Sequence, residues 1–398
     1  MSPARVLDLT RSMRRAGRTA TGVDRVELAY LDQFLADDVP VFGLLRTAFG
    51  YVLLDRAGMV AVRDRLTGAM AWGSADILSR LPRGRSPALV RAETDARKHA
   101  IARCLPFRLR KMLAGALVNG FDYYNIGHSN LTERVLNSVK YASGRVHVFV
   151  HDVIPLEFPD FQRPGTVVPF REKLMRVRRL ADRVIYNSED TRDRCEAVMR
   201  EWGAPPDGIV SHLGAIVPKP NTQSLPRGML PKRPYFVTVG TIEPRKNHAF
   251  LLDLWEKMGP DAPPLLICGA RGWNNKAVFD RLDRLPPGSP IKEVADLGDG
   301  TLAALVQESA GMLFPSHAEG FGLPPLEALQ LQTRVLCNDL TVLREILGEN
   351  ATFAPVSDQE NWLKTIKSWE HTPPEACKEN SFVGPKWADH FKTVLRLR

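Results

Sequence analysis

The 398-residue sequence is poor in cysteine, and its five cysteines are scattered. No two are spaced as Cys-x-x-Cys, which argues against a disulfide framework and against a zinc site. They are Cys104, Cys195, Cys268, Cys337 and Cys377. This use of cysteine predicts a reducing, cytoplasmic environment.

Long apolar runs are also missing. No stretch approaches the ~18 to 20 apolar residues of a membrane span, and the opening "MSPARVLDLTRSMRRAGR" has no apolar signal-peptide core. With 44% hydrophobic and 25% charged residues, the composition is that of an ordinary globular protein rather than a disordered or collagen-like one. We therefore expect a soluble protein, or at most a peripheral one at the inner face of the plasma membrane.

The positive charge is concentrated in the first half of the chain. The formal charge is +9, and residues 1–225 hold 34 Lys and Arg against 24 Asp and Glu, whereas the remainder holds 20 against 21. Such a field favours an anionic partner, which includes acidic lipid headgroups, a diphosphate-linked acceptor and nucleic acid. An ordinary solvated surface explains the same charge equally well.

Strand-like and helix-like segments alternate in both halves, which predicts two α/β domains with mostly parallel sheets. Residues 216–234 carry five prolines and read as a linker. We predict an acceptor-binding domain over 1–215, a donor-binding domain over 216–380 and a closing helix over 381–398 that packs back on the first domain. Residues 57–120 read as helical and basic. Two doubly wound domains place ligands between them, at the carboxyl ends of the strands.

The stretch "SHAEGFGLPPLEALQ", residues 316–330, sets Glu319 and Glu327 on either side of a glycine- and proline-rich loop. The two prolines suit the first turn of a helix, and the two glycines let the backbone approach a ligand closely. Loop amides at a helix N-terminus form an anion-binding site, and ionised carboxylates accept hydrogen bonds from sugar hydroxyls. Taken singly, each glutamate also fits a structural role, with Glu327 complementing the helix dipole.

A second stretch, "VGTIEPRKN", residues 239–247, ends a predicted strand with Arg245 and Lys246 just before a helix. Two cations beside free helix amides suit a diphosphate, whereas a solvated basic turn is the plainer interpretation.

These two stretches resemble the signatures of family-four glycosyltransferases. Members of that family are retaining enzymes of GT-B type, in which two Rossmann-like domains face each other across a cleft. The resemblance returns in the first domain at "TGVDRVELAY", "HDVIPLEFPD" and "VIYNSEDTRD". The sequences of both motifs are similar to those of bacterial mannosyl and rhamnosyl transferases of polysaccharide biosynthesis, so GDP-mannose is the leading donor.

The resemblance assigns roles to individual residues. It implies that Arg245 and Lys246 bind the donor diphosphate, that Glu319 contacts the transferred sugar, and that His151 lies against that sugar. The residues expected to bind the rest of the nucleotide sugar are Gly22, Glu243, Phe321, Gly322, Leu323 and Glu327. Among these, Glu327 binds the ribose hydroxyls and Glu243 anchors the basic loop. His128 in "NIGHSN" is expected to face the acceptor.

The predicted reaction is hexosyl transfer, mannosyl favoured, from a nucleotide-diphosphate sugar to a saccharide or lipid-linked saccharide. No Asp-x-Asp pair is present, so no metal site and no cofactor beyond the donor are expected. Two other classes stay open: a glycoside hydrolase using Glu319 and Glu327, which leaves the Arg-Lys turn unexplained, and a basic nucleic-acid-binding protein. The sequence lacks the zinc and aromatic signatures of the latter, and we expect no nucleic-acid partner.

Overall fold

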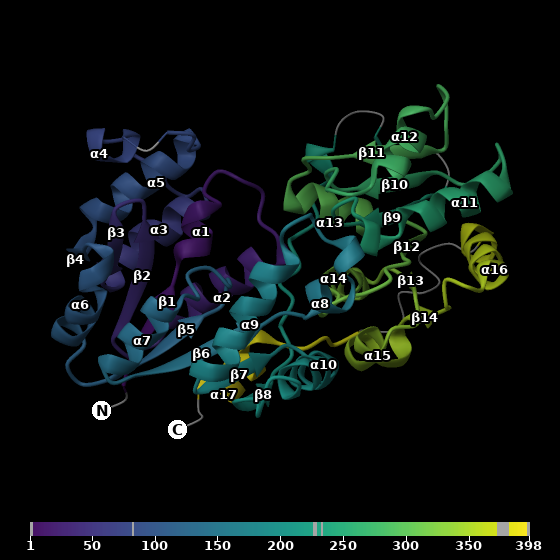
Figure 1. Cartoon of the computed structure of the whole chain (residues 1–398). Helices are drawn as coiled ribbons and strands as arrows, with labels where there is room; N and C mark the ends of the chain where they lie inside the picture. Colours follow the sequence, from purple (N-terminus) through teal and green to yellow (C-terminus); the bar gives the residue numbers. More distant parts are fainter. Residues whose placement is uncertain (1–2, 82, 226–228, 232–233, 372–381, 396–398) are drawn as a thin grey trace.

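Two open β-sheets, each covered by helices, build the protein (Figure 1). The computed structural model describes residues 3–81, 83–225, 229–231, 234–371 and 382–395. Within these residues, the first sheet has eight strands in the order β4-β3-β2-β1-β5-β6-β7-β8, and the second has six in the order β11-β10-β9-β12-β13-β14. In each sheet the first strand lies inside, and the chain winds outward in both directions. This is the doubly wound α/β architecture that the sequence predicts.

The first sheet and its helices span residues 4–210. The strands are β1 Ala4–Asp8, β2 Val41–Thr47, β3 Gly50–Leu54, β4 Ala100–Cys104, β5 Phe121–Asn125, β6 Gly144–Val150, β7 Arg183–Tyr186 and β8 Asp207–Val210. The helices are α1 Thr10–Arg14, α2 Gly22–Ala36, α3 Arg56–Leu66, α4 Ile77–Arg80, α5 Pro87–Lys98, α6 Leu109–Ala116, α7 Glu133–Tyr141, α8 Ile154–Glu157, α9 Val167–Leu180 and α10 Glu189–Arg200. Short 3₁₀ turns lie at Pro106–Arg108 and Pro159–Phe161.

The second sheet and its helices follow the proline-rich linker. The strands are β9 Phe236–Val239, β10 Leu265–Cys268, β11 Ile291–Val294, β12 Gly311–Phe314, β13 Val335–Cys337 and β14 Thr352–Phe353. The helices are α11 His248–Met258, α12 Lys276–Asp283, α13 Asp299–Gln307, α14 Leu323–Gln330, α15 Thr341–Leu347, α16 Gln359–His371 and α17 Trp387–Leu395. Further 3₁₀ turns lie at Thr222–Ser224, Pro244–Lys246 and Gly348–Asn350.

Local sequence explains where the key helices begin. Thr21 and Asp24 form a capping box at the start of α2, in which each side chain satisfies a backbone amide of the other. Ser188 caps α10 by accepting a hydrogen bond from the amide of Thr191 at 3.0 Å. Helix α10 starts directly after β7, whereas α2 follows β1 only after the short helix α1 and a loop.

One edge of the first sheet departs from the prediction. Residues 57–120 contain not only helices but also β4, and β3 runs antiparallel to both of its neighbours. The β3 strand also needs glycine, because a side chain at Gly50 would lie 1.9 Å from the carbonyl oxygen of Cys104. Residues 57–120 are helical as expected at α3, α4, α5 and α6, but the expectation missed β4. This edge strand has alternating exposure, and its exposed face carries Ile101 and Arg103.

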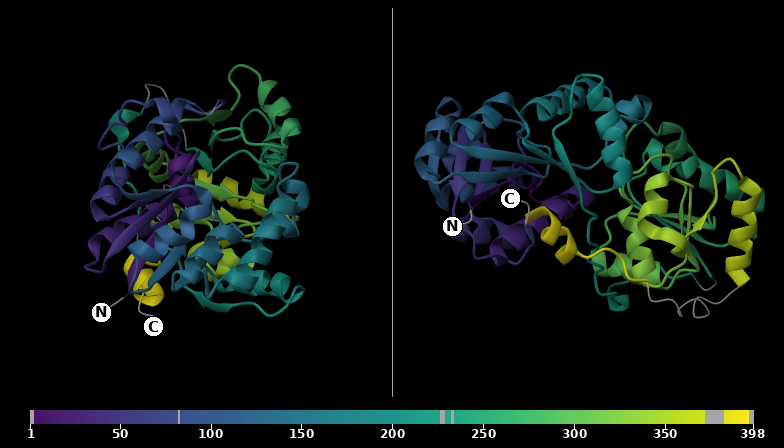
Figure 2. Two further views of the ribbon diagram at one scale, coloured as in Figure 1. Left: turned by 60° about the vertical axis from the view of Figure 1, so that its left-hand side comes forward. Right: turned by 90° about the horizontal axis from the view of Figure 1, so that it is seen from below.

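The last helix returns to the first domain. In α17, His390 forms a 2.8 Å hydrogen bond with the hydroxyl of Tyr30 on α2, and its other ring nitrogen faces the carbonyl of Ser211. Figure 2 shows this yellow helix beside the first domain. The domain boundary predicted between residues 380 and 381 lies outside the described residues, and so does Cys377. No helix in the described ranges is both long and apolar enough to cross a membrane.

Candidate active site

The glycine-rich loop leads into α14 at the carboxyl edge of the second sheet. Gly322 is the N-cap residue and has a φ of 91°, a conformation that favours glycine. Pro324 and Pro325 follow in the first turn, so neither contributes an amide hydrogen. In the described part of the chain, the amides of Phe321, Gly322 and Leu323 have no protein acceptor. The donors of this helix end are thereby limited to three consecutive amides.

The basic turn lies next to this loop. Arg245 and Lys246 occupy a 3₁₀ turn after β9, and Asn247 takes left-handed backbone angles (φ 54°) before α11. Lys246 is buried, and its ammonium lies 4.4 Å from the centroid of the Phe314 ring. The amide of His317 donates to the carbonyl of Arg245 at 2.7 Å and so ties the turn to the glutamate loop.

Glu319 connects the two motifs. One of its carboxylate oxygens lies 2.7 Å from Nζ of Lys246, and the other lies 2.8 Å from Nη1 of Arg245. Burial alone would raise the pKa of Glu319, but the attraction of the two cations outweighs it and lowers that pKa to about 2. Burial lowers the pKa of Lys246, and Glu319 opposes that effect. Both oxygens of Glu319 are therefore engaged by positive charge, one by the buried Lys246 and the other by the partly buried Arg245.

Glu243 forms the other side of this cluster. Its carboxylate is buried and lies 2.6 Å from Nε of Arg245, while its Oε2 atom has no hydrogen-bond partner among the described residues. Burial opposes the charge on Arg245, but Glu319 and Glu243 together raise its pKa. Two cations thus face two carboxylates, and the cluster holds Arg245 in one orientation by contacts on both sides.

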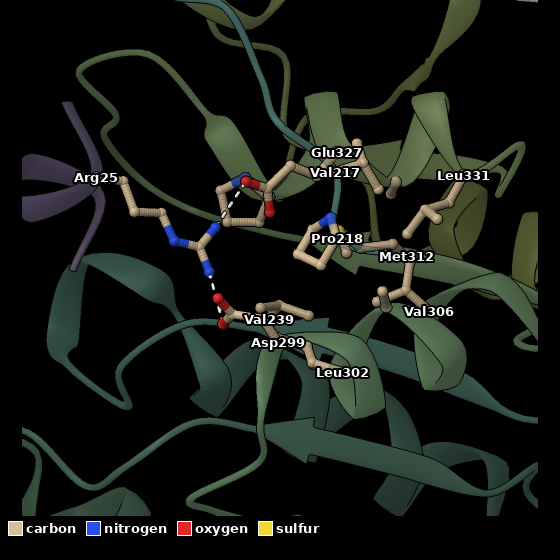
Figure 3. A pocket seen from close by; sticks show the side chains of 13 residues that line it. Arg25, Val217, Pro218, Val239, Asp299, Leu302, Val306, Met312, Glu327 and Leu331 are labelled. Atoms are coloured by element: carbon tan, nitrogen blue, oxygen red, sulfur yellow. Dashed lines mark hydrogen bonds and ion pairs between the residues drawn. The ribbon is translucent and has the colours of Figure 1, made fainter. Parts of the chain in front are cut away.

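Glu327 does not join this cluster and instead contacts the first domain. Arg25 of α2 reaches across to Glu327 at 2.8 Å and to Asp299 at 3.1 Å, as Figure 3 shows. Burial raises the pKa of Glu327, and Arg25 opposes that shift. Apolar side chains line the hollow beyond this ion pair, including Met312 and Leu331 (Figure 3).

His151 lies where the two domains meet. It directly follows β6, is buried, and places Nε2 2.8 Å from the carbonyl oxygen of Ile126. Burial lowers its pKa to about 4, so the imidazole is neutral at pH 7. The glycine loop approaches its backbone so closely that a side chain at Gly320 would lie 2.4 Å from the His151 carbonyl oxygen.

Two further predicted residues lie at the same junction. Gly22 begins α2, and a side chain there would lie 3.4 Å from the Leu323 side chain. His128 is buried beside His151, with ring centroids 5.4 Å apart, and its own Nε2 faces the carbonyl of Phe149. Burial lowers the pKa of His128 well below its usual value. The predicted residues of both domains therefore converge at facing sheet edges.

Several residues of this junction were not predicted from the sequence. Glu345 of α15 accepts hydrogen bonds from the amides of Glu189 and Asp190 at the start of α10, at 2.7 and 3.0 Å, and also contacts His212. It therefore caps a helix of the other domain. Arg25 lies within the quoted stretch "TGVDRVELAY", but its partner is 302 residues away, and no local signal indicates that pairing.

No cluster of three or more metal-ligating side chains occurs among the residues that the structure describes.

Comparison with known proteins gives a consistent picture. Residues 225–382 match the family described as "Glycosyl transferases group 1". Relatives include the serotype-specific mannosyltransferase WbdA of Escherichia coli, 32% identical over 251 residues, which are 59% of this chain and 31% of that protein. Another is O-antigen chain mannosyltransferase B of Escherichia coli, 25% identical over 78% of this chain and 84% of that protein. The chain spans about a third of the length of the WbdA relatives that it matches.

Solved structures show the same fold. Sucrose-phosphate synthase of Thermosynechococcus elongatus superimposes with a TM-score of 0.63 at 14% identity, over 99% of this chain and 98% of that one. Anabaena HepE in complex with UDP-glucose gives 0.60 at 12% identity, over 98% and 94%. These neighbours have the GT-B fold, so the predicted fold class is confirmed.

Proposed function

The chain carries a glycosyl transferases group 1 domain in a GT-B fold, and from this premise we propose that it is a hexosyltransferase. It moves a hexosyl group from a nucleotide-diphosphate sugar to a saccharide or lipid-linked saccharide acceptor in surface polysaccharide biosynthesis. A mannosyl group is favoured, because the relatives in the comparison are named as mannosyltransferases. GDP-mannose is accordingly the leading donor.

One observation carries this proposal. The Arg245–Lys246 turn and the amides at the start of α14 lie on one loop cluster, tied together by Glu319. That cluster faces the loop after β6, where Gly320 approaches His151. Cations and unpaired amides at the carboxyl edge of a doubly wound sheet are suited to a diphosphate.

In the proposed reaction, Arg245 and Lys246 stabilise the charge that grows on the leaving diphosphate as the glycosidic C–O bond breaks. The amides of Phe321, Gly322 and Leu323 donate along the sugar and phosphate. Glu319, ionised at neutral pH, orients the cations and contacts the transferred sugar. Glu327 accepts hydrogen bonds from the ribose hydroxyls, for which it must share or release Arg25.

We propose a retaining transfer in which the leaving phosphate takes the proton of the attacking acceptor hydroxyl on the same face of the sugar. The reaction uses no metal, because Arg245 and Lys246 supply the positive charge that a metal supplies elsewhere. His151, neutral at pH 7, lies against the donor sugar as a hydrogen-bonding group rather than as a cation.

A peripheral contact with an anionic membrane completes the proposal. Phe107 is 71% exposed and Leu105 51% exposed, next to the exposed cations Arg108, Arg110 and Lys111. Exposed apolar and basic side chains together favour the interface of an acidic bilayer. This surface lies in the basic first half and suits an enzyme that acts on a lipid-linked acceptor.

The decisive experiment is a thermal-shift screen with GDP-, UDP-, dTDP- and ADP-sugars, followed by NMR of the product made with the best donor. A single nucleotide should raise the melting temperature strongly, since only a ligand of the native state stabilises it by mass action. The new linkage should have the anomeric configuration of the donor. No shift with any of them, or an inverted product, would contradict the proposal.

The hydrolase alternative is not favoured. A glycosidase of that kind needs Glu319 and Glu327 on either side of one bond, whereas Glu319 pairs with Arg245 and Lys246, and Glu327 pairs with Arg25 of the first domain.

A further inference from the structure

A cationic hollow lies in the first domain and shares no lining residue with the Arg245–Lys246 turn. Its volume is about 530 Å³, and its lining comes from α1, the end of β2, the loop before α5, and α5 itself. The lining residues are Arg14, Arg46, Thr47, Ala48, Arg85, Leu89 and Glu93. We call it the arginine hollow. A volume of this size is typical of a small-molecule site.

Two of its three arginines carry uncompensated charge. Arg85 is paired with the buried carboxylate of Glu93, and Glu93 also accepts a hydrogen bond from the amide of Ala48 at 3.2 Å. Arg46 is half-buried and lies over the Tyr51 ring, 4.9 Å from its centroid. In the described ranges, neither Arg46 nor Arg14 has a carboxylate partner. The hollow therefore has a net positive charge of two.

The hollow lies at the same edge of the first sheet as residues that contact the second domain. The β1 and β2 strands are parallel, with Asp8 opposite Leu44, so Arg46 lies at the carboxyl edge of the sheet. Its amide donates to the hydroxyl of Thr10 at the start of α1. The same edge holds Gly22 and His151, which contact the second domain. In Figure 1, α1 lies on the side of the first domain that is turned toward the second.

We propose that the arginine hollow binds a diphosphate group on the acceptor. This inference rests on the proposed transferase function and deepens it, because it assigns the acceptor to the diphosphate-linked saccharides. The donor diphosphate already has its own cations and amides in the second domain, so this hollow is left for a second anion. Planar guanidinium groups suit phosphate oxygens because each offers paired N–H donors.

The binding test uses the full chain saturated with the nucleoside diphosphate selected by the donor screen. The proposed donor site at the Arg245–Lys246 turn is then occupied. Inorganic pyrophosphate is then titrated by calorimetry. The wild type should show one further site, and the double variant R14Q/R46Q should bind pyrophosphate at least about tenfold more weakly. The control R103Q/R284Q removes the same charge from exposed positions outside the hollow. It should bind as the wild type does.

The kinetic test compares one saccharide acceptor with and without an alkyl diphosphate at its reducing end. In the wild type, kcat/KM should favour the diphosphate form, and R14Q/R46Q should reduce that preference at least about tenfold, mainly through KM. Thermal melts establish that the variants are folded. The inference would be overturned if R14Q/R46Q kept the wild-type preference for the diphosphate form, or if R103Q/R284Q lost that preference equally. Glucuronate, an anion without phosphate, is titrated in the same way as pyrophosphate. Tighter binding of glucuronate than of pyrophosphate would also overturn the inference. Failure of the whole proposed function has a different signature, namely no nucleotide-dependent thermal shift in any variant.

Discussion

The ion pairs of Glu319 allow a quantitative test of the site. Replacing Glu319 with glutamine keeps the shape of the side chain but removes the charge that both Lys246 and Arg245 contact. The pKa of Glu319 falls from 4.5 to about 2 in the folded protein, which corresponds to about 3 kcal/mol of stabilisation at neutral pH. In E319Q the buried Lys246 also loses its counter-charge, so the loss of stability should be at least of this order.

The sign of the pH dependence follows from the lowered pKa. A carboxyl whose folded pKa lies below its unfolded value contributes its full stability above pH 4.5 and loses it as the pH falls toward 2. The difference in unfolding free energy between wild type and E319Q should therefore be constant from pH 7 to 5. It should then shrink between pH 4.5 and 2.

Urea unfolding followed by tryptophan fluorescence is a suitable assay, because Trp255 and Trp362 are buried in the second domain. The matched control is E256Q, since the Glu256 side chain is 72% exposed and contacts Arg281 only at the surface. We expect E256Q to change the free energy of unfolding by less than about 0.5 kcal/mol. If E319Q were as stable as E256Q at pH 7, or if its deficit stayed the same in acid, Glu319 would not be held by two charges.

The remaining predictions concern donor binding, catalysis and membrane contact. K246A should lower kcat by about 10² to 10³-fold, because it removes a cation that stabilises the leaving diphosphate. An unchanged kcat would exclude this role for Lys246. E327A should weaken donor binding at least about tenfold in calorimetry. R25A should tighten donor binding by up to about fivefold, because it removes the ion pair that occupies Glu327; the effect is small because that ion pair is partly exposed. Weaker binding would mean that Arg25 itself holds the donor. F107S should reduce sedimentation of the protein with vesicles that contain acidic lipid. The activity of the wild type should survive a chelator without added magnesium.

Local sequence predicted the parts of the site that one short segment encodes. The Pro-Pro pair and the preceding glycines predict a helix that starts beside a ligand-facing loop, and α14 begins at Leu323 with Gly322 in a left-handed conformation. The alternation of strands and helices likewise predicted both domains. The β5 strand was not anticipated, because "FDYYN" places Asp122 and Asn125 among aromatic residues. Only the packed sheet shows that this strand is buried throughout.

The sequence by itself determined two α/β domains, a cationic turn and a glutamate loop, because each depends on residue types within about ten positions of one another. The tertiary structure alone decided which charges meet. It paired Glu319 with both cations, and it joined Arg25 to Glu327 across 302 residues. It also brought Arg14, Arg46 and Arg85 around one hollow. Such pairings depend on how the domains pack, and burial then decides whether each charge is neutralised or left available for an anion.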